Sequence, residues 1–147
     1  VGSVPKTEVL ELKKIKASEV IASKLGLGKG EPVVYLYRRR FADNEPIVLQ
    51  KTYLSCKKCG FILDCDFTKD SLYKSLARTN QTKVVRVQRI VEVDEATNED
   101  AENLEIAMGK PIQSFTTTGF NVFGEVIEFS LARYRGDRSR FEVSANI

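Results

Sequence analysis

Two arginines in one predicted strand are the first candidates for chemistry. Arg38 and Arg40 lie two residues apart in residues 32–41, whose β-branched and aromatic side chains favour a strand. Alternate side chains of a strand project from the same face, so the two guanidinium groups would be about 7 Å apart. Such a pair can hold a phosphate or a carboxylate through charge-assisted hydrogen bonds. The alternative interpretation is an exposed basic strand end.

A second candidate lies in residues 125–134, where apolar and polar positions alternate. A carboxylate, Glu128, and a phenol, Tyr134, are separated by small side chains that leave space above the sheet. A carboxylate there accepts hydrogen bonds from sugar hydroxyls or an amine, as the floor of a pocket would. The alternative is a solvated outer face. The expected apolar face is Ile127, Phe129 and Leu131, and the opposite face is Glu128, Ser130, Ala132 and Tyr134.

A predicted helix over residues 69–78, with Thr68 as its N-cap, places Ser71 and Tyr73 in its first turn. Free N–H groups and the positive end of the helix dipole attract anions at such a position. The alternative is that Ser71 only helps to cap the helix.

The elements that must position these residues indicate an α+β fold. Residues 32–41 and 47–54 predict a hairpin whose three-residue loop, 43–45, would place Gln50 opposite Arg38. Valines at period two in residues 84–93 predict a strand with one buried face, and Thr97 three residues before Asp100 resembles a capping box. Hairpin-connected strands imply a mostly antiparallel sheet, with the helices on one side. The remaining expected elements are strands at 8–15, 111–122, 125–134 and 140–144, and helices at 18–25 and 97–106, ended by Gly26 and Gly109.

Three cysteines within ten residues raise the question of a metal or redox site. Cys56, Cys59 and Cys65 are an odd number, which makes a poor disulfide framework and favours a reducing compartment. A structural zinc needs four ligands, so these thiols would have to recruit Asp64 or Asp66. The alternative, which we prefer, is loop thiols without a special role.

Composition and missing motifs argue for binding rather than catalysis. The 147 residues suit one domain, and the net charge of +3 is spread along the chain, which does not favour nucleic-acid contact. No stretch approaches the roughly 18–20 apolar residues of a membrane span. There is no histidine, no glycine-rich phosphate loop and no carboxylate pair placed as acid and base. We therefore expect no catalytic residue, no cofactor, no metal and no membrane partner, and a cytoplasmic location.

Taken in order, several segments resemble the UTRA domain, the effector-binding domain of the HutC subfamily of GntR-type bacterial transcription regulators. The resemblance covers residues 8–144. Its motifs are Leu25-Gly26-Leu27 with Gly30, residues 37–46 (YRRRFADNEP), Ser71-Leu72-Tyr73 with Leu76, Ala96 with Ala101, residues 104–111, residues 124–128 (GEVIE) and residues 134–141 (YRGDRSRF).

The resemblance implies a chorismate-lyase-like fold used for sensing, a homodimer, and a winged helix-turn-helix domain that would precede Val1 and contact operator DNA. It implies a phosphorylated effector, such as a sugar phosphate, and a repressor whose effector-binding domain is residues 1–147. By that resemblance the effector phosphate binds Arg38, Arg40, Ser71 and Tyr73, and the effector body binds Gln50, Glu128 and Tyr134. Amino-sugar-sensing relatives carry glutamate where this chain has Gln50. The alternative function is a lyase of the same fold that acts on an aromatic carboxylate.

Overall fold

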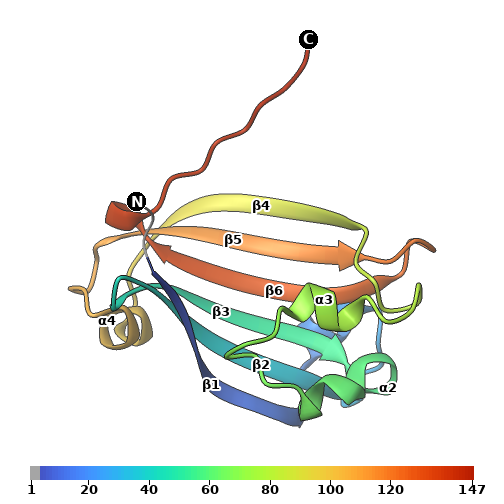
Figure 1. Cartoon of the computed structure of the whole chain (residues 1–147). Helices are drawn as coiled ribbons and strands as arrows, with labels where there is room; N and C mark the ends of the chain where they lie inside the picture. Colours follow the sequence, from blue (N-terminus) through green and yellow to red (C-terminus); the bar gives the residue numbers. More distant parts are fainter. Residues whose placement is uncertain (1–3) are drawn as a thin grey trace.

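One six-stranded antiparallel sheet, ordered β1-β2-β3-β6-β5-β4, organises the chain (Figure 1). The structure, a computed structural model, describes residues 4–147. The antiparallel α+β arrangement expected from the hairpin pattern is confirmed. The strands are β1 (Pro5–Lys16), β2 (Pro32–Ala42), β3 (Glu45–Ser55), β4 (Arg86–Glu95), β5 (Pro111–Phe120) and β6 (Val126–Arg135).

Short helices cover both faces of the sheet, so the prediction of helices on one side was wrong. Strand β2 shows the reason, because its residues 33–37 are buried on both faces. Val34 and Leu36 pack against the segment from α2 to α3, whereas Tyr35 and Tyr37 pack toward α4. The helices are α1 (Glu19–Leu25), α2 (Cys56–Cys59), α3 (Leu72–Leu76) and α4 (Asn98–Leu104), with 3-10 turns η1 (Gly60–Asp64) and η2 (Gly136–Arg138). Within residues 4–147, no helix has both the length and the apolar character needed to cross a membrane.

Local capping signals explain where α1 and α4 begin. Ser18 caps α1, and Gly26 ends it in the left-handed conformation, as predicted. Thr97 and Asp100 form a reciprocal capping box at the start of α4, which is also confirmed. The predicted end of α4 at Gly109 was wrong. Glu105 adopts φ 58° and terminates the helix earlier.

The β2–β3 hairpin turns through two residues rather than the predicted three. Asp43 and Asn44 both have positive φ, 50° and 64°, which is the signature of a tight type I′ hairpin turn. The register then shifts between Arg40 and Phe41, and this irregularity compensates for the shorter turn. Arg38 consequently pairs with Gln50, as predicted.

A register irregularity in β6 separates Ile127 from Phe129 and Leu131, with which it was predicted to share an apolar face. Phe120 pairs with Val126 but Gly119 pairs with Glu128, so Ile127 is an extra residue between two ladder positions. The alternation therefore breaks at this point. Ile127 packs with Leu36 and Leu72 on the side of α3, whereas Phe129 packs with Val33 near α1.

The strand predicted at 84–93 forms as β4, but its predicted burial was wrong, and so was the strand predicted at 140–144. Every residue of β4 is exposed, although the valine periodicity predicted one buried face. The strand lies at the free edge of the sheet, and no helix covers it (Figure 1). The expected last strand at 140–144 does not form. Residues 139–147 have no regular structure, and the end of the chain extends away from the sheet (Figure 1).

Candidate functional site

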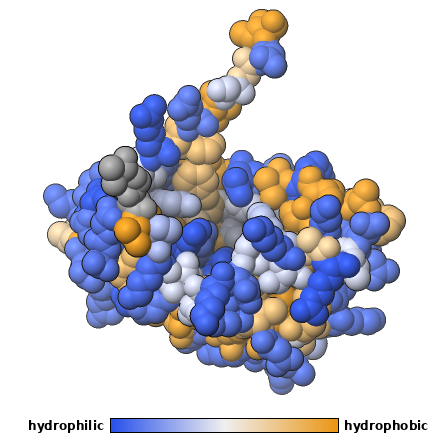
Figure 2. All heavy atoms as spheres, viewed as in Figure 1, coloured by the Kyte–Doolittle hydropathy of each residue, from blue (hydrophilic) through white to orange (hydrophobic). Residues whose placement is uncertain are grey.

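A pocket of about 610 Å³ opens between the sheet and the segment that carries α3, on the face seen in Figure 2. This volume lies within the range of small-molecule sites in proteins. All seven site residues predicted from the sequence line the pocket, although they come from three strands and one loop-helix segment. They are Arg38, Arg40, Gln50, Ser71, Tyr73, Glu128 and Tyr134.

Strand register explains why the floor of the pocket is polar. On the same face as Arg38, the paired residues Thr52 of β3, Ser130 of β6 and Thr117 of β5 form a row across the sheet. Arg89 of β4 continues the row, and its Nε donates to Thr117 Oγ1 at 3.2 Å. Sequence reasoning missed this part of the lining because it depends on which strands are neighbours. The missed lining residues include Thr7, Thr52, Arg89, Phe115, Thr117, Ser139, Arg140 and Phe141, whereas Ser130 was expected on the pocket floor.

The wall opposite the floor is the segment from Phe67 to Tyr73. Phe67 and Leu72 are buried in the core beneath it, which fixes the wall to the sheet. Ser71, not Thr68, is the N-cap of α3, and its hydroxyl accepts from the Lys74 N–H at 3.4 Å. The hydroxyl proton of Ser71 remains free to donate. The sequence predicted that the dipole of this helix attracts an anion at its N-terminal turn. With only five residues, α3 is too short to provide such a dipole.

The predicted helix start was wrong because Thr68 belongs to a local turn. Its backbone N–H and its hydroxyl both donate to Asp66 Oδ1. The N–H groups of Lys69 and Asp70 donate to the Asp66 carbonyl, so the backbone after Thr68 forms a turn instead of the first turn of a helix. The helix therefore starts three residues later, at Leu72.

Two buried polar atoms in the pocket lack partners among the described residues. They are Arg38 Nε and Gln50 Oε1, which belong to opposite residues in the β2–β3 ladder. Burial lowers the pKa of Arg38 to about 10, repulsion from Arg40 adds to this, and Glu128 partly offsets it. Arg38 nevertheless stays charged at neutral pH. Because buried polar groups are normally paired, these two atoms make this part of the pocket the candidate ligand site.

The Glu128 carboxylate is the acceptor at the centre of a hydrogen-bond chain. Its side chain is only 2% exposed. The Tyr73 hydroxyl donates to Oε1, and the Ser130 hydroxyl donates to Oε2 at 2.7 Å. Thr52 Oγ1 lies 2.9 Å from Ser130 Oγ and extends the chain across the floor. Burial and the Glu128 charge raise the pKa of Tyr73, so this phenol stays protonated as a donor.

Gly119 provides the space that Glu128 occupies. A Cβ at this position would lie 2.7 Å from Glu128 Cγ and 2.9 Å from its Oε1. Both distances are shorter than real Cβ contacts, so any larger residue would displace the carboxylate. The glycine in β5 is therefore part of the site, although it has no functional group.

An aromatic cluster closes the end of the pocket near the C-terminal segment. The rings of Phe115 and Tyr134 meet edge to face with centroids 5.2 Å apart, and Phe141 meets Phe115 at the same separation. Such faces give a ligand an apolar surface beside the polar groups. The hydroxyl of Ser139 donates to Gln113 at 2.5 Å and ties the following segment to β5.

Comparison with known proteins identifies the family. The model of the UTRA domain matches residues 1–140. The chain belongs to the UTRA family. The resemblance drawn from the sequence motifs is therefore confirmed.

The UTRA relatives of this chain include bacterial regulators. It is 30% identical over 142 residues to the HTH-type transcriptional regulator GmuR of Bacillus subtilis, covering 90% of this chain and 60% of that protein. It is 26% identical over 140 residues to the HTH-type transcriptional repressor NagR of the same organism, covering 95% and 57%. The chain thus spans less than two thirds of the length of these curated relatives.

Solved structures support the fold of this UTRA domain. The effector domain of PhnF from Mycobacterium smegmatis superimposes with a TM-score of 0.90 at 21% identity, covering 98% of this chain and 88% of that one. The C-terminal domain of the histidine utilization repressor from Pseudomonas syringae pv. tomato gives a TM-score of 0.89 at 19% identity, covering 98% and 100%.

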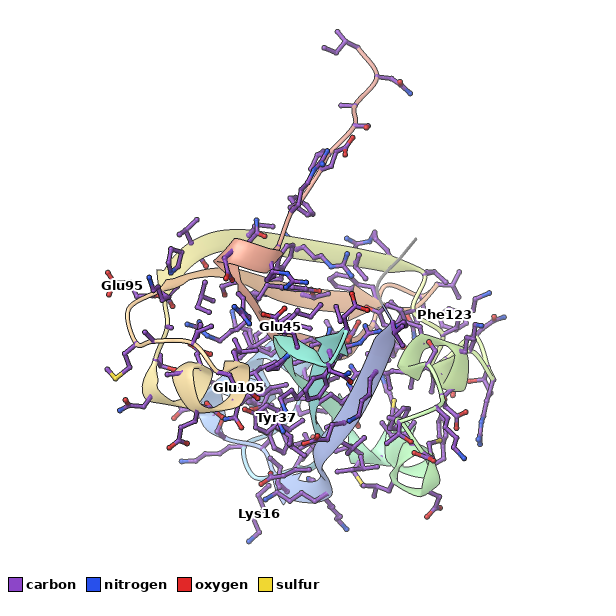
Figure 3. All side chains as sticks on the ribbon, turned by 60° about the vertical axis from the view of Figure 1, so that its left-hand side comes forward. Lys16, Tyr37, Glu45, Glu95, Glu105 and Phe123 are labelled. Carbon is purple, nitrogen blue, oxygen red and sulfur yellow. The ribbon has the colours of Figure 1, made fainter. Side chains whose placement is uncertain are left out.

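The closing UTRA motif has a structural task in this chain. Arg135 binds Asp137 within the motif and Glu45 at the start of β3. Arg138 also donates to Glu45, which is labelled in Figure 3. A Cβ at Gly136 would lie 2.8 Å from the Pro111 carbonyl oxygen, so the turn needs glycine there. The motif therefore anchors the end of β6, which also carries Tyr134.

The cysteines lie beneath the pocket wall rather than in a ligand cluster. Cys59 is fully buried, and burial raises the pKa of its thiol to about 11. Cys56 and Cys65 are half-buried and pack against the same core. Within residues 4–147, no three histidine, cysteine or carboxylate side chains are grouped as metal ligands would be.

Proposed function

We propose that this UTRA domain is the ligand-sensing part of a GntR-type transcription regulator and binds a small phosphorylated metabolite, with a sugar phosphate as the best fit. The observation that carries the proposal is the pair of unpartnered buried atoms, Arg38 Nε and Gln50 Oε1, in a pocket with a buried carboxylate. A cationic end and a hydrogen-bonding interior match a ligand with one anionic group and several hydroxyls.

One end of the pocket is proposed to bind the phosphate and the other end to bind the rest of the ligand. Arg38 and Arg40 bind the phosphate, and the free proton of the Ser71 hydroxyl donates to it. Tyr73 was expected to assist there, but its hydroxyl donates to Glu128, so it also supports the other end. Ligand hydroxyls reach Glu128, Tyr134 and Gln50. The aromatic rings beside Tyr134 provide a surface for the apolar face of a sugar ring.

The whole regulator is proposed to be a cytoplasmic homodimeric repressor. A winged helix-turn-helix domain N-terminal to this one would contact operator DNA. Support comes from the names and greater length of the HTH-type relatives. Ligand binding would change DNA affinity only if the ligand binds one arrangement of the dimer more tightly than the other.

A thermal-shift screen tests the pocket directly. Hexose and disaccharide phosphates are compared with their unphosphorylated parents on the native chain, on Arg38→Ala and on Arg78→Ala, an arginine outside the pocket. A ligand at a hundred times its Kd stabilises the native state by about 2.7 kcal/mol. We expect a shift that requires the phosphate, is lost in Arg38→Ala and persists in Arg78→Ala. Equal shifts with the unphosphorylated parents would contradict the proposal.

The lyase alternative receives less support than sensing. Glu128 is the one buried carboxylate among the described pocket residues, and both of its oxygens already accept hydrogen bonds. An acid and base pair is therefore not assembled in this geometry. Turnover of chorismate by the purified chain would reverse this conclusion.

A further inference from the structure

A third arginine, Arg89 of β4, lines the pocket at the end of the floor opposite Arg38 and Arg40. Strands β3, β6 and β5 lie between β2 and β4, which places β2 and β4 about 19 Å apart along the sheet (Figure 1). Arg38 and Arg40 together match the two negative charges of a phosphate. Arg89 is therefore available to a different group of the same ligand.

Contacts with β5 and α3 direct the Arg89 side chain toward the pocket. Its Nε donates to Thr117 Oγ1 at 3.2 Å, and no described carboxylate forms an ion pair with its guanidinium. Thr117 is only 6% exposed, so this contact lies on the pocket floor. Burial and the Glu128 charge raise the pKa of Tyr73, and the Arg89 charge acts in the opposite direction. The guanidinium therefore lies near the Tyr73 hydroxyl.

This end of the pocket offers hydrogen-bond donors and no free charge of opposite sign. Thr117 Oγ1 already accepts from Arg89, and no described residue accepts the Thr117 hydroxyl proton. The η nitrogens of Arg89 carry only N–H donors. Such a site selects a ligand group that accepts hydrogen bonds, and the positive charge favours an anion. The buried Glu128 carboxylate, by contrast, selects hydroxyl groups.

A carboxylate fits this end of the pocket better than a second phosphate does. The planar fork of a guanidinium matches the two oxygens of a carboxylate in a bidentate pair. One arginine balances one negative charge, whereas the proposed phosphate site uses both Arg38 and Arg40. The Arg89 end is therefore matched to a group with a single negative charge.

We propose that Arg89 and Thr117 form a carboxylate subsite, so that the ligand of this domain is a phosphorylated sugar acid rather than a neutral sugar phosphate. The inference rests on the proposed sensing function and narrows its ligand class. The phosphate binds at Arg38 and Arg40, sugar hydroxyls reach Glu128, and the carboxylate binds at Arg89.

Calorimetric titration with matched ligands tests the subsite. 6-Phosphogluconate is compared with glucitol 6-phosphate, an open chain that carries an alcohol in place of the carboxylate. Phosphorylated cellobionate is compared with phosphorylated cellobiitol, which extends the same comparison to a longer ligand. In at least one pair, the acid should bind about tenfold more tightly or better, because hydrogen bonds to charged groups are strong. Equal binding of acid and alcohol in both pairs overturns the proposal.

Two arginine variants of β4 locate the effect. Arg89→Gln removes the charge and keeps a hydrogen-bonding side chain, so it should abolish the preference for the acid and leave binding of the alcohol nearly unchanged. Arg86→Gln is the matched control, because its guanidinium lies over the Phe120 ring at 4.0 Å and does not line the pocket. A preference that survives in Arg89→Gln, or that both variants lose equally, contradicts the subsite.

The hydroxyl of Thr117 is tested separately. Thr117→Val removes the donor with little change in volume, so the preference for the acid should fall by about threefold. Thr118→Val, the next residue of β5 on the opposite face, should keep the native preference. An unchanged preference in Thr117→Val would contradict the role given to this hydroxyl.

The carboxylate subsite and the phosphate site fail in different ways. If acid and alcohol phosphates bind equally, the carboxylate subsite is wrong and the phosphate site stands. If gluconate or cellobionate binds through Arg89 as tightly as its phosphorylated form, the phosphate site is wrong and the carboxylate subsite stands. Absence of binding by all of these compounds contradicts both proposals.

Discussion

Two sets of arginines lie on opposite faces of the same sheet, and they differ in their partners. On the α4 face, Arg39 binds Glu8 at 2.7 Å, and Arg133 binds the buried Asp100 at 2.9 Å. On the pocket face, no described carboxylate forms an ion pair with Arg38, Arg40 or Arg89. Charges on the α4 face are paired within the chain, whereas the unpaired arginines of the pocket face line the site at which we propose that the ligand binds.

The α4 face combines several such pairs around one helix. Tyr37, which lies beside α4 in Figure 3, donates to Glu99 at 2.8 Å, and Lys51 binds the same carboxylate at 2.9 Å. Asp100 accepts from Arg133 and from the Thr97 N–H. Among the described residues, Arg39 Nε is the one buried side-chain atom of this face without a hydrogen-bond partner, so this face offers less to a ligand than the pocket face.

The largest expected effect comes from breaking a pair on the α4 face. Asp100→Ala leaves Arg133 without its buried partner and removes the capping box, so we expect unfolding free energy to fall by about 3 kcal/mol. Urea denaturation measures this. Asp94→Ala, which removes only the exposed partner of Arg133, should have a smaller effect. Phosphate-ligand affinity should be unchanged in both variants, and a loss of affinity would contradict the division between the faces.

The second-largest expected effect comes from Gly119, whose missing side chain leaves the space that Glu128 occupies. Gly119→Ala forces Glu128 to move, and overpacking of this kind lowers stability by about 1–3 kcal/mol. We also expect weaker binding of any sugar phosphate, because the Tyr73 and Ser130 hydrogen bonds to Glu128 are displaced. Calorimetric titration measures the second effect. Thr118→Ala, the neighbouring β5 position on the opposite face, is the matched control. Unchanged binding in Gly119→Ala would exclude Glu128 from the site.

Adjacent arginines provide the sharpest contrast. Arg40→Ala should reduce phosphate-ligand affinity by about 1.5–3 kcal/mol, the value of a charge-assisted hydrogen bond, and leave stability nearly unchanged. Arg39→Ala should lower stability by about 1 kcal/mol and leave affinity unchanged. Both quantities are measured on both variants by titration and urea denaturation. Exchanged or equal effects would show that the strand faces have been assigned incorrectly.

The smallest effect is a pH dependence confined to the α4 face. Burial alone would raise the pKa of Asp100, but the hydrogen bonds from Arg133 and Thr97 outweigh it and lower the pKa. A lowered pKa in the folded state contributes stability above the ordinary aspartate pKa, about 3.9, and loses it as pH falls through the folded value. The stability difference between the native chain and Asp100→Asn should therefore shrink below about pH 4. A constant difference would contradict the lowered pKa.

Sequence alone predicted seven of the residues that line the pocket, because the signals for these residues were local. Arg38 and Arg40 follow strand alternation, and Glu128 and Tyr134 lie on the same side of β6 beyond its irregularity. Arg89 was missed because its role depends on β4 lying next to β5, a long-range pairing that periodicity does not encode. Ile127 was placed on the wrong face because one extra residue reverses the alternation.

The exposed valines of β4 were misread for a related reason. Alternation predicts which side chains share a face, but not whether the same chain covers that face. The sequence pattern of a strand is the same whether or not its own chain covers its apolar side chains. The valine periodicity therefore could not show that residues 4–147 leave every residue of β4 exposed. The free end at 139–147 is similar, because its short apolar alternation has no neighbouring strand here.

Arg89 belongs both to the pocket lining and to the middle of the exposed strand. A ligand that fixes this side chain therefore also orders part of the exposed edge of the sheet. If this ordering couples ligand binding to the proposed homodimerisation, the two equilibria are thermodynamically linked, and the linkage is reciprocal. If dimerisation increases ligand affinity by some factor, saturating ligand must tighten the dimer by the same factor per site.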